Sequence, residues 1–330
     1  MKKTGALLLG LALSLFALFP LSAREAAYTG EDYNIRLFYN DVAFPGDAVF
    51  VRMIIEQNGK KNKDKQLEET SATLELFNSE KRLDKAAFYS LPSDSSKTRL
   101  TLLAGIALSS WLNSSDSYKL SVKYKPYGGQ TMEFELPFGL DKKDFEEYTL
   151  QATQGMTNIQ NDRSEKRMKQ IEKLNKALGT FDTKGVYQTT AFVPPTQATR
   201  RTSYYAERRI YKYTNGKEVT SLHYGTDYGI PTGSKVTSCA AGKVVVAENR
   251  VTTGWSVCIE HLPGLYSLYY HMSELKVKEG DTVKAGDLIG LSGATGFARG
   301  PHLHWEMRLN MSAVNPDFFV NDFTFSASAQ

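Results

Sequence analysis

Four of the five histidines in this 330-residue chain fall in three short motifs whose residue types could bind a metal ion. The motifs are His223-Tyr224-Gly225-Thr226-Asp227, Tyr270-His271-Met272-Ser273 and Gly300-Pro301-His302-Leu303-His304-Trp305-Glu306. Apolar and polar residues alternate from 302 to 307, which predicts a β-strand. Because residues two apart in a strand share a face, His302 and His304 point to the same side.

Zinc is the ion that best matches this donor set. Zinc binds imidazole nitrogen and carboxylate oxygen, and a catalytic zinc site uses three protein ligands and leaves the fourth position for water. His223, Asp227 and one member of the pair His302 and His304 would supply three ligands. Taken alone, a histidine is more often an ordinary hydrogen-bonded residue. We assign that ordinary role to His261, which lies at a predicted strand end beside a turn.

The motifs occur in the order His-x-x-x-Asp, then His before Ser, then Gly-x-His-x-His. This combination resembles the lysostaphin/LytM-type zinc metallopeptidases, which cut the peptide part of peptidoglycan. The resemblance covers residues 200–318 and implies that His223, Asp227 and His304 bind one Zn²⁺ ion. It also implies that His271 and His302 are the two catalytic histidines.

The resemblance leads to a hypothesis for the mechanism. His302 is expected to accept a proton from water and pass it to the departing amine, while His271 orients the water or stabilises the tetrahedral oxyanion. One segment departs from the family pattern. Relatives usually carry an aromatic residue followed by glycine where this chain has Tyr205-Ala206-Glu207-Arg208-Arg209, so the local turn there is open to question.

The first 23 residues have the pattern of a secretory signal peptide. Lys2 and Lys3 precede an apolar run over residues 6–21, and the small residue Ala23 follows. The run contains Gly10 and Pro20 and is short for a membrane span, so a retained anchor is the less favoured alternative. We expect an exported, cell-wall-associated protein of the periplasm or extracellular space, with no stable membrane span after signal removal.

Charge and cysteine content limit the partners and the redox chemistry. The formal charge of +4 falls to +2 when Lys2 and Lys3 are removed with the signal, so we expect no binding to nucleic acid. Cys239 and Cys258 lie in apolar, strand-like segments. In an oxidising compartment they could form a disulfide, and the equally favoured alternative is two buried free thiols.

Residues 24–140 are predicted to form a β-sandwich of immunoglobulin-like type. Period-two patterns predict strands at 34–39, 48–57, 71–77, 99–103, 117–125 and 130–138. This region contains no histidine, so we expect it to space, orient or bind a partner rather than to catalyse. Its lysine-rich segment 58–66 is interpreted as a solvated loop. The less favoured alternative is that these lysines contact an anionic wall polymer.

Residues 141–200 are predicted to be a linker, and residues 201–330 the peptidase domain. In the linker, Asp162 and the helical spacing of Met168, Ile171, Leu174 and Leu178 predict a capped helix over 163–178. In the peptidase domain, glycines separate short strands, and the family resemblance implies a compact antiparallel sheet whose groove has zinc at its floor. The whole chain is therefore expected to be mainly β.

The function expected from these residues is a secreted zinc metalloendopeptidase that hydrolyses peptide bonds in the stem or cross-bridge peptides of peptidoglycan. Two alternatives are a non-catalytic relative that binds the wall or activates another hydrolase, and a zinc peptidase that acts on proteins. The intact set of five site residues favours the first reading over the second. The bond that is cut and the oligomeric state do not follow from the sequence.

Overall fold

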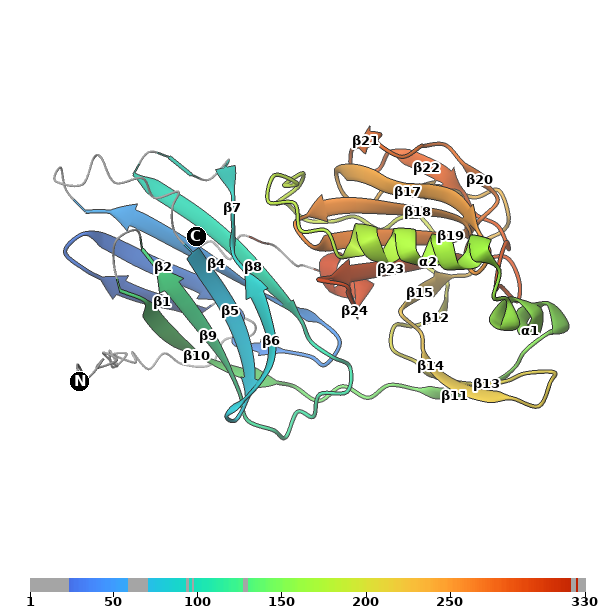
Figure 1. Cartoon of the computed structure of the whole chain (residues 1–330), viewed down its shortest axis with the longest axis horizontal. Coiled ribbons are helices and arrows are strands. Elements are labelled where there is room, and N and C mark those ends of the chain that lie inside the picture. The colour runs from blue at the N-terminus through green and yellow to red at the C-terminus, as the bar shows by residue number, and fades with distance from the viewer. Residues whose placement is uncertain are drawn as a thin grey trace.

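The computed structural model describes residues 24–58, 71–92, 95–96, 98–126, 130–321 and 325. The predicted signal peptide and most of the lysine-rich segment 58–66 lie outside these residues. Within them, no helix has the length and apolar character needed to span a membrane. The described chain forms a sandwich of strands followed by a second β-rich domain that also carries two helices (Figure 1).

Two five-stranded sheets build the N-terminal domain. The first sheet has the order β1 (Arg24–Thr29), β2 (Tyr33–Tyr39), β4 (Ala48–Gln57), β8 (Arg99–Ala107) and β7 (Tyr89–Ser90). The second has the order β3 (Val42–Ala43), β10 (Met132–Leu140), β9 (Tyr118–Lys125), β5 (Ser71–Asn78) and β6 (Lys81–Ala87). The strands pair in antiparallel fashion except β3 and β10, which are parallel.

The two sheets enclose one apolar core because alternate residues of their strands are large and apolar. Val51 and Met53 of β4 and Leu120 and Val122 of β9 belong to the same buried cluster. All six predicted strands are present. Four further strands were not predicted from the sequence: β1, the short strands β3 and β7, and the polar edge strand β6. The two-sheet arrangement matches the prediction, while its immunoglobulin type stays a prediction.

The connection between the domains contains more structure than the predicted linker. β11 (Glu147–Gln151) pairs in parallel with β13 (Arg208–Lys212), which pairs in turn with β14 (Glu218–Leu222). A short helix, α1 (Gln154–Asn161), comes next and buries Met156. Its polar sequence gave no helical pattern; Met156 packs in a cluster with Ala152 and Tyr213, so tertiary contact stabilises it.

The helix predicted over 163–178 is present as α2 (Glu165–Leu178), but Asp162 is not its N-cap. Ser164 caps it, because its side chain accepts a hydrogen bond from the backbone N–H of Arg167, whereas Asp162 ends α1. The helix lies across the large sheet of the second domain (Figure 1). Gln170 fixes it there, donating to the carbonyl of Asn249 at 2.9 Å and accepting from the N–H of Val251 at 2.9 Å.

An eight-stranded antiparallel sheet forms the second domain. Its order is β12 (Arg201–Ser203), β15 (Gly225–Tyr228), β23 (Leu303–Leu309), β19 (Leu265–Met272), β18 (Gly254–Leu262), β17 (Gly242–Arg250) and β21 (Thr282–Val283), with β24 (Ser312–Val314) also paired to β23. A small sheet has the order β16 (Lys235–Thr237), β22 (Leu288–Leu291) and β20 (Glu274–Leu275). A 3₁₀ turn, η3 (Pro316–Phe319), follows β24.

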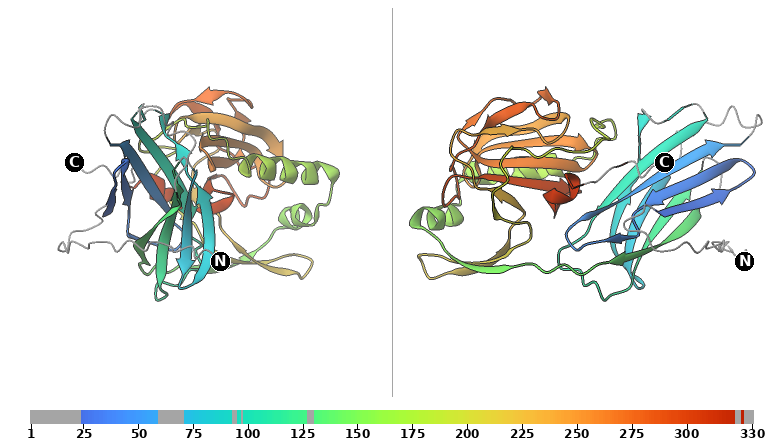
Figure 2. Two further views of the ribbon diagram at one scale, coloured as in Figure 1. Left: turned by 60° about the vertical axis from the view of Figure 1, so that its left-hand side comes forward. Right: turned by 180° about the vertical axis from the view of Figure 1, so that it is seen from behind.

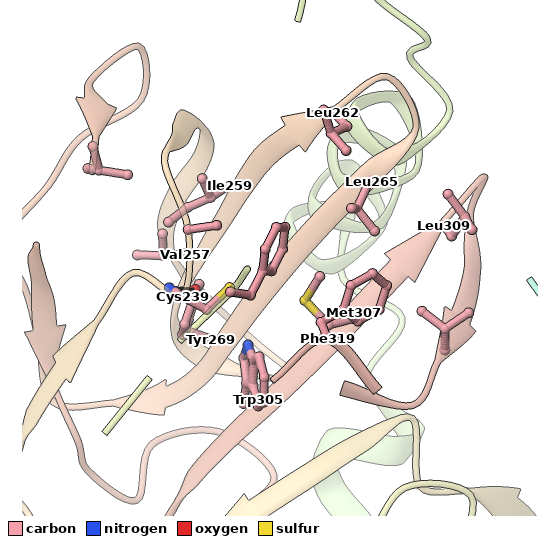
Figure 3. Packing of buried hydrophobic residues seen from close by; sticks show 14 of the residues in the cluster. Cys239, Val257, Ile259, Leu262, Leu265, Tyr269, Trp305, Met307, Leu309 and Phe319 are labelled. Atoms are coloured by element: carbon pink, nitrogen blue, oxygen red, sulfur yellow. Dashed lines mark hydrogen bonds between the residues drawn. The ribbon is translucent and has the colours of Figure 1, made fainter. Parts of the chain in front are cut away.

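One face of the large sheet packs into a dense core in which Tyr269, Trp305 and Met307 are fully buried (Figure 3). Cys239 belongs to this core, whereas Cys258 faces the other side of the sheet and packs in a cluster with Leu178 of α2. Both cysteines are free thiols. Of the two alternatives for Cys239 and Cys258, the structure therefore has the buried thiols, because Cys239, in the bend after β16, and Cys258, on β18, pack in different clusters.

The main core of the second domain continues into the N-terminal sandwich, and Figure 2 shows the two domains lying against one another. Phe50 of β4 packs against Phe319 and Phe325, with ring centroids 6.3 and 5.1 Å away. Polar contacts surround it: the Asn310 side chain donates to the carbonyl of Gly105 at 2.9 Å, and that of Asn315 donates to Asp47 at 2.9 Å. The sandwich is therefore fixed to the second domain by a shared core.

Truncation of this shared core should destabilise both domains together. We expect Phe50→Ala to lower the free energy of unfolding by about 3 kcal/mol, because it removes a large buried ring and leaves a cavity. Denaturant titration followed by tryptophan fluorescence and by circular dichroism measures the change. Phe77→Ala, at a half-buried ring under Lys119, is the matched control and should cost about 1 kcal/mol or less. Two well-separated transitions in the parent protein would contradict a shared core.

His261 has the ordinary role expected of it, as a fully buried core residue. Its Nδ1–H donates to the carbonyl of Ala241 at 2.8 Å, and its Nε2 accepts from the hydroxyl of Ser267 at 2.7 Å. Burial lowers the pKa of His261 to about 4. The imidazole is thus neutral in the folded chain at pH values where the unfolded chain already binds a proton.

This depressed pKa predicts an acid-sensitive contribution to stability. The contribution is complete above pH 6.5, where both states are neutral, and it is lost progressively as the pH falls toward 4, because only the unfolded state takes up the proton. We expect the loss through His261 to approach about 3 kcal/mol. Unfolding titrations between pH 7 and 4 should therefore show a shallower decline for His261→Gln than for the parent; identical pH slopes would refute the assignment.

Candidate metal centre

Strand register brings the first and last of the three histidine motifs together. β15 and β23 pair so that Asp227 lies directly opposite His304, which places both side chains on one face of the sheet. His223 precedes β15 in an extended segment, as Gly225 and Pro231 favoured in the sequence. All three residues are buried, and each offers one ligand atom to a common point.

The three ligand atoms lie about as close together as hydrogen-bonded atoms. His223 Nε2 is 3.1 Å from Asp227 Oδ1 and 2.9 Å from His304 Nδ1, and His304 Nδ1 is 2.9 Å from Asp227 Oδ1. Each imidazole uses its other nitrogen elsewhere: His223 Nδ1 lies 2.8 Å from the carbonyl of Tyr204, and His304 Nε2 lies 3.3 Å from Glu306 Oε2. These acceptors require a proton on the outer nitrogens, so in the neutral imidazoles, the form that binds a metal ion, the inner nitrogens carry lone pairs.

The electrostatics of the centre correspond to a site built for a positive charge. Burial alone would raise the pKa of Asp227, but His223 and His304 hold it well below its usual value. Burial lowers the pKa of His223. For His304, burial is outweighed by its hydrogen bonds to Asp227 and Glu306, which raise its pKa to about 9. The centre therefore attracts a cation.

The donor set fits zinc. Three lone-pair atoms at about 3 Å repel one another unless a proton or a metal ion lies among them. Two imidazole nitrogens and one carboxylate oxygen are ligands that zinc accepts, and three protein ligands leave one coordination position free. His223, Asp227 and His304 would hold the ion.

The residues packed around His304 leave no space for a larger side chain at Gly225. A Cβ added to Gly225 would lie 2.3 Å from the carbonyl oxygen of Trp305 and 2.8 Å from His304 Nε2, so only glycine fits beside that ring. On the other side, the ring of Tyr270 stacks on His304 with centroids 5.3 Å apart and an interplanar angle of 8°. The imidazole of His304 is therefore confined on both sides.

A β-bulge turns His271 toward the same face. Tyr269 and Met272 both pack in the main core, although strict alternation would send residues three apart to opposite faces. The extra residue appears in the register between β18 and β19, and His271 takes a φ of 61°. A non-glycine residue in this left-handed region is strained, and such strain occurs typically at functional sites.

His302 completes the group of five. It lies just before β23, where its backbone N–H donates to the carbonyl of Gly293 at 3.0 Å. Its Nε2 is 3.9 Å from Asp227 Oδ1, and its ring centroid is 4.7 Å from that of His271. The structure thus brings all five sequence-predicted site residues within reach of one another.

His271 and His302, the two site histidines that are not expected to be metal ligands, are oriented in the same way. His271 Nδ1 lies 2.8 Å from the carbonyl of Thr295, and His302 Nδ1 lies 2.8 Å from the carbonyl of Gly300. Each Nδ1 must therefore carry the proton, which leaves a lone pair on each Nε2. Burial, together with His302 and His304, lowers the pKa of His271 to about 3, so His271 is neutral at physiological pH.

The departure from the family pattern at Ala206 does not break the local turn. Ala206 takes a φ of 64°, a conformation that glycine adopts without strain, and its N–H donates to the carbonyl of His223 at 2.7 Å. In return, the N–H of His223 donates to the carbonyl of Glu207 at 3.0 Å. This pair of backbone bonds fixes the chain next to the first of the three motifs.

Two charged residues that contact the ligands, Glu306 and Arg209, were not among the sequence-predicted site residues. Glu306 bonds His304 and forms an ion pair with Arg308, and burial is outweighed by these partners, which hold the pKa of Glu306 below its usual value. Arg209 pairs with Glu207 and approaches Asp227. Glu306 could have been found from its alternation with His304, whereas nothing in the local sequence connects Arg209 to a residue 18 positions later.

Comparisons with known proteins match the segment that carries this centre to a described family. Residues 221–316 match the sequence pattern of peptidase family M23. The DD-carboxypeptidase/endopeptidase Mpg of Neisseria meningitidis is 41% identical over 95 residues, 29% of this chain and 22% of its own length. The peptidoglycan DD-endopeptidase ShyA of Vibrio cholerae is 39% identical over 116 residues, 35% of this chain and 26% of its own length. The matches thus span about a quarter of these curated relatives.

A structural likeness extends over most of the described chain. A Pseudomonas aeruginosa protein assigned to peptidase M23 superposes with a TM-score of 0.54, covering 85% of this chain and 96% of its own, at 20% identity. At that identity the likeness concerns the fold alone. The match to the family spans residues 221–316, which include His223, Asp227, His271, His302 and His304. Over that segment, about three tenths of its length, the chain matches peptidase family M23.

Proposed function

We propose that this protein is an exported zinc metalloendopeptidase that hydrolyses peptide bonds in the stem or cross-bridge peptides of peptidoglycan. The observation that carries the proposal is the convergence of His223 Nε2, Asp227 Oδ1 and His304 Nδ1 at mutual distances of 2.9–3.1 Å. Two further imidazoles beside this convergence support catalysis rather than a purely structural metal, because a structural zinc site is closed by four protein ligands.

When bound, zinc supplies a Lewis acid that polarises the scissile carbonyl and eases deprotonation of water. The chain's own residues handle the proton. The lone pair of His302 Nε2 makes it an acceptor for a proton from the attacking water, and the Nδ1 bond to Gly300 holds the ring in that tautomer. The same nitrogen would then deliver the proton to the departing amine.

The orientation of His271 favours one of the two roles considered for it. With Nδ1–H committed to the carbonyl of Thr295, its Nε2 has a lone pair and no proton. Such a nitrogen can accept a hydrogen bond from water, but it cannot donate one to an oxyanion. We therefore assign His271 to orienting the water, and its bulge conformation keeps the ring in place.

The substrate class rests on the relatives. The names of Mpg and ShyA describe a carboxypeptidase/endopeptidase and a peptidoglycan endopeptidase, and the two proteins match this chain over 95 and 116 residues. Export to the periplasm or cell surface, predicted from residues 1–23, would place this chain in the compartment of that substrate.

Substitutions separate the metal-binding role from the proton-transfer role. His304→Ala should lose both zinc and activity, because it removes a ligand. His302→Ala should retain stoichiometric zinc and lose about 10²–10⁴-fold in kcat, because only the proton acceptor is gone. Zinc content by atomic spectrometry and turnover of a peptidoglycan peptide measure the two effects. Normal hydrolysis by His302→Ala would refute its assignment.

Purified sacculi test the substrate. Metal-loaded protein incubated with peptidoglycan should release fragments with new amino termini in the stem or bridge peptides, and a chelator should abolish the release. Mass spectrometry of the soluble fragments gives the bond that is cut, and His304→Ala is the control for contaminating hydrolases. Intact sacculi alongside zinc-dependent cleavage of a protein substrate would instead support the alternative of a general zinc peptidase.

A further inference from the structure

We propose that Arg209 is a positioning residue that holds Asp227 so that a single carboxylate oxygen faces the metal position. The inference rests on the zinc centre proposed above and adds to it a residue outside the three histidine motifs. Arg209 lies on β13, in the three-stranded sheet that β11 joins to the connecting segment. It approaches the centre from a different sheet than the one that carries Asp227 and His304.

The two oxygens of Asp227 have different neighbours. Oδ1 faces the inner nitrogens of His223 and His304 at 3.1 and 2.9 Å. Oδ2 faces Arg209, whose Nη2 lies 3.5 Å away, within ion-pair distance. The guanidinium therefore sits on the outer oxygen and leaves only the inner one directed at the metal position.

Arg209 is itself held in place. Its Nε and Nη2 donate to Glu207 Oε2 at 3.1 and 2.9 Å, and its Nη1 donates to the hydroxyl of Tyr211 at 3.4 Å. Glu207 in turn accepts a hydrogen bond from the backbone N–H of Tyr204. The carbonyl of Tyr204 accepts a hydrogen bond from the Nδ1–H of His223. A chain of part-buried contacts thus joins the supports of two ligands, His223 and Asp227.

This arrangement matters because a carboxylate can bind a metal through one oxygen or both. A second bound oxygen would take the position that a catalytic zinc site leaves for water or substrate. A guanidinium on Oδ2 opposes that rotation by electrostatic attraction, and its own bonds to Glu207 and Tyr211 keep it in place. Arg209 would thus keep the open position open without touching substrate.

The test compares metal binding and coordination in variants of the full chain. Arg209→Met removes the charge, Arg209→Lys keeps it, and Glu207→Gln combined with Arg209→Met avoids leaving Glu207 buried without its partner. Arg208→Met is the matched control, because Arg208 is the preceding residue on β13 but bonds Ser110 of the sandwich instead. Zinc affinity is measured by competition with a chromogenic chelator. Cobalt substituted for zinc reports coordination number through the intensity of its visible absorption bands.

We expect Arg209→Met and the double variant to bind zinc 10–100-fold more weakly. Their cobalt bands should lose intensity, as the coordination number rises with a second carboxylate oxygen. Arg209→Lys should recover part of the affinity, and Arg208→Met should match the parent in both readouts.

Parent affinity and an unchanged cobalt spectrum in the double variant would overturn the inference, whatever its activity. A raised KM with unchanged metal binding would also overturn it, because Arg209 would then contact substrate. Failure of the parent protein itself to bind zinc would refute the proposed function instead. If Arg209→Met does not fold, the double variant decides the question.

Discussion

The structure depends on one electrostatic constraint, the presence of three lone-pair atoms within about 3 Å of one another in a buried place. His223, Asp227 and His304 can occupy these positions only if a positive charge lies among them. The surroundings hold the atoms there. The carbonyl of Tyr204 accepts a hydrogen bond from the outer N–H of His223, and the carboxylate of Glu306 accepts one from the outer N–H of His304. These bonds orient the inner nitrogens toward one point.

Backbone strain on both sides of the centre serves the same geometry. His271 and Ala206 each adopt positive φ values, which cost about 1–2 kcal/mol for a residue with a side chain. The strain at His271 moves an imidazole from the core face of β19 to the site face. The strain at Ala206 allows the pair of backbone bonds with His223. Dense packing of the sheet, with Trp305 fully buried behind it, makes such conformations sustainable.

The N-terminal sandwich and the connecting segment are packed against the domain that carries the metal centre rather than loosely attached to it. Phe50 of the sandwich packs in the core that lies behind the eight-stranded sheet. β11 pairs with β13 in the three-stranded sheet β11–β13–β14, from which Arg209 approaches Asp227. The setting of the ligands therefore depends on chain segments that precede the matched family segment.

The sequence by itself determined the residue types of the centre. Two imidazoles alternating in a strand, a third histidine four residues before an aspartate and a fourth before a serine predicted a zinc site. The resemblance that these motifs carry then named the five site residues. The same period-two patterns located six strands of the sandwich. These features are local, because side-chain alternation depends only on the backbone of the strand itself.

Only the tertiary structure decided which lone pairs face inward, because each tautomer depends on an acceptor supplied by another segment. It also decided that His271 turns out of alternation, that Cys239 and Cys258 remain apart as free thiols, and that Arg209 reaches Asp227. The physical reason is common to all of them. Contacts between segments far apart in the chain fix these features, and no periodicity within one segment encodes such contacts.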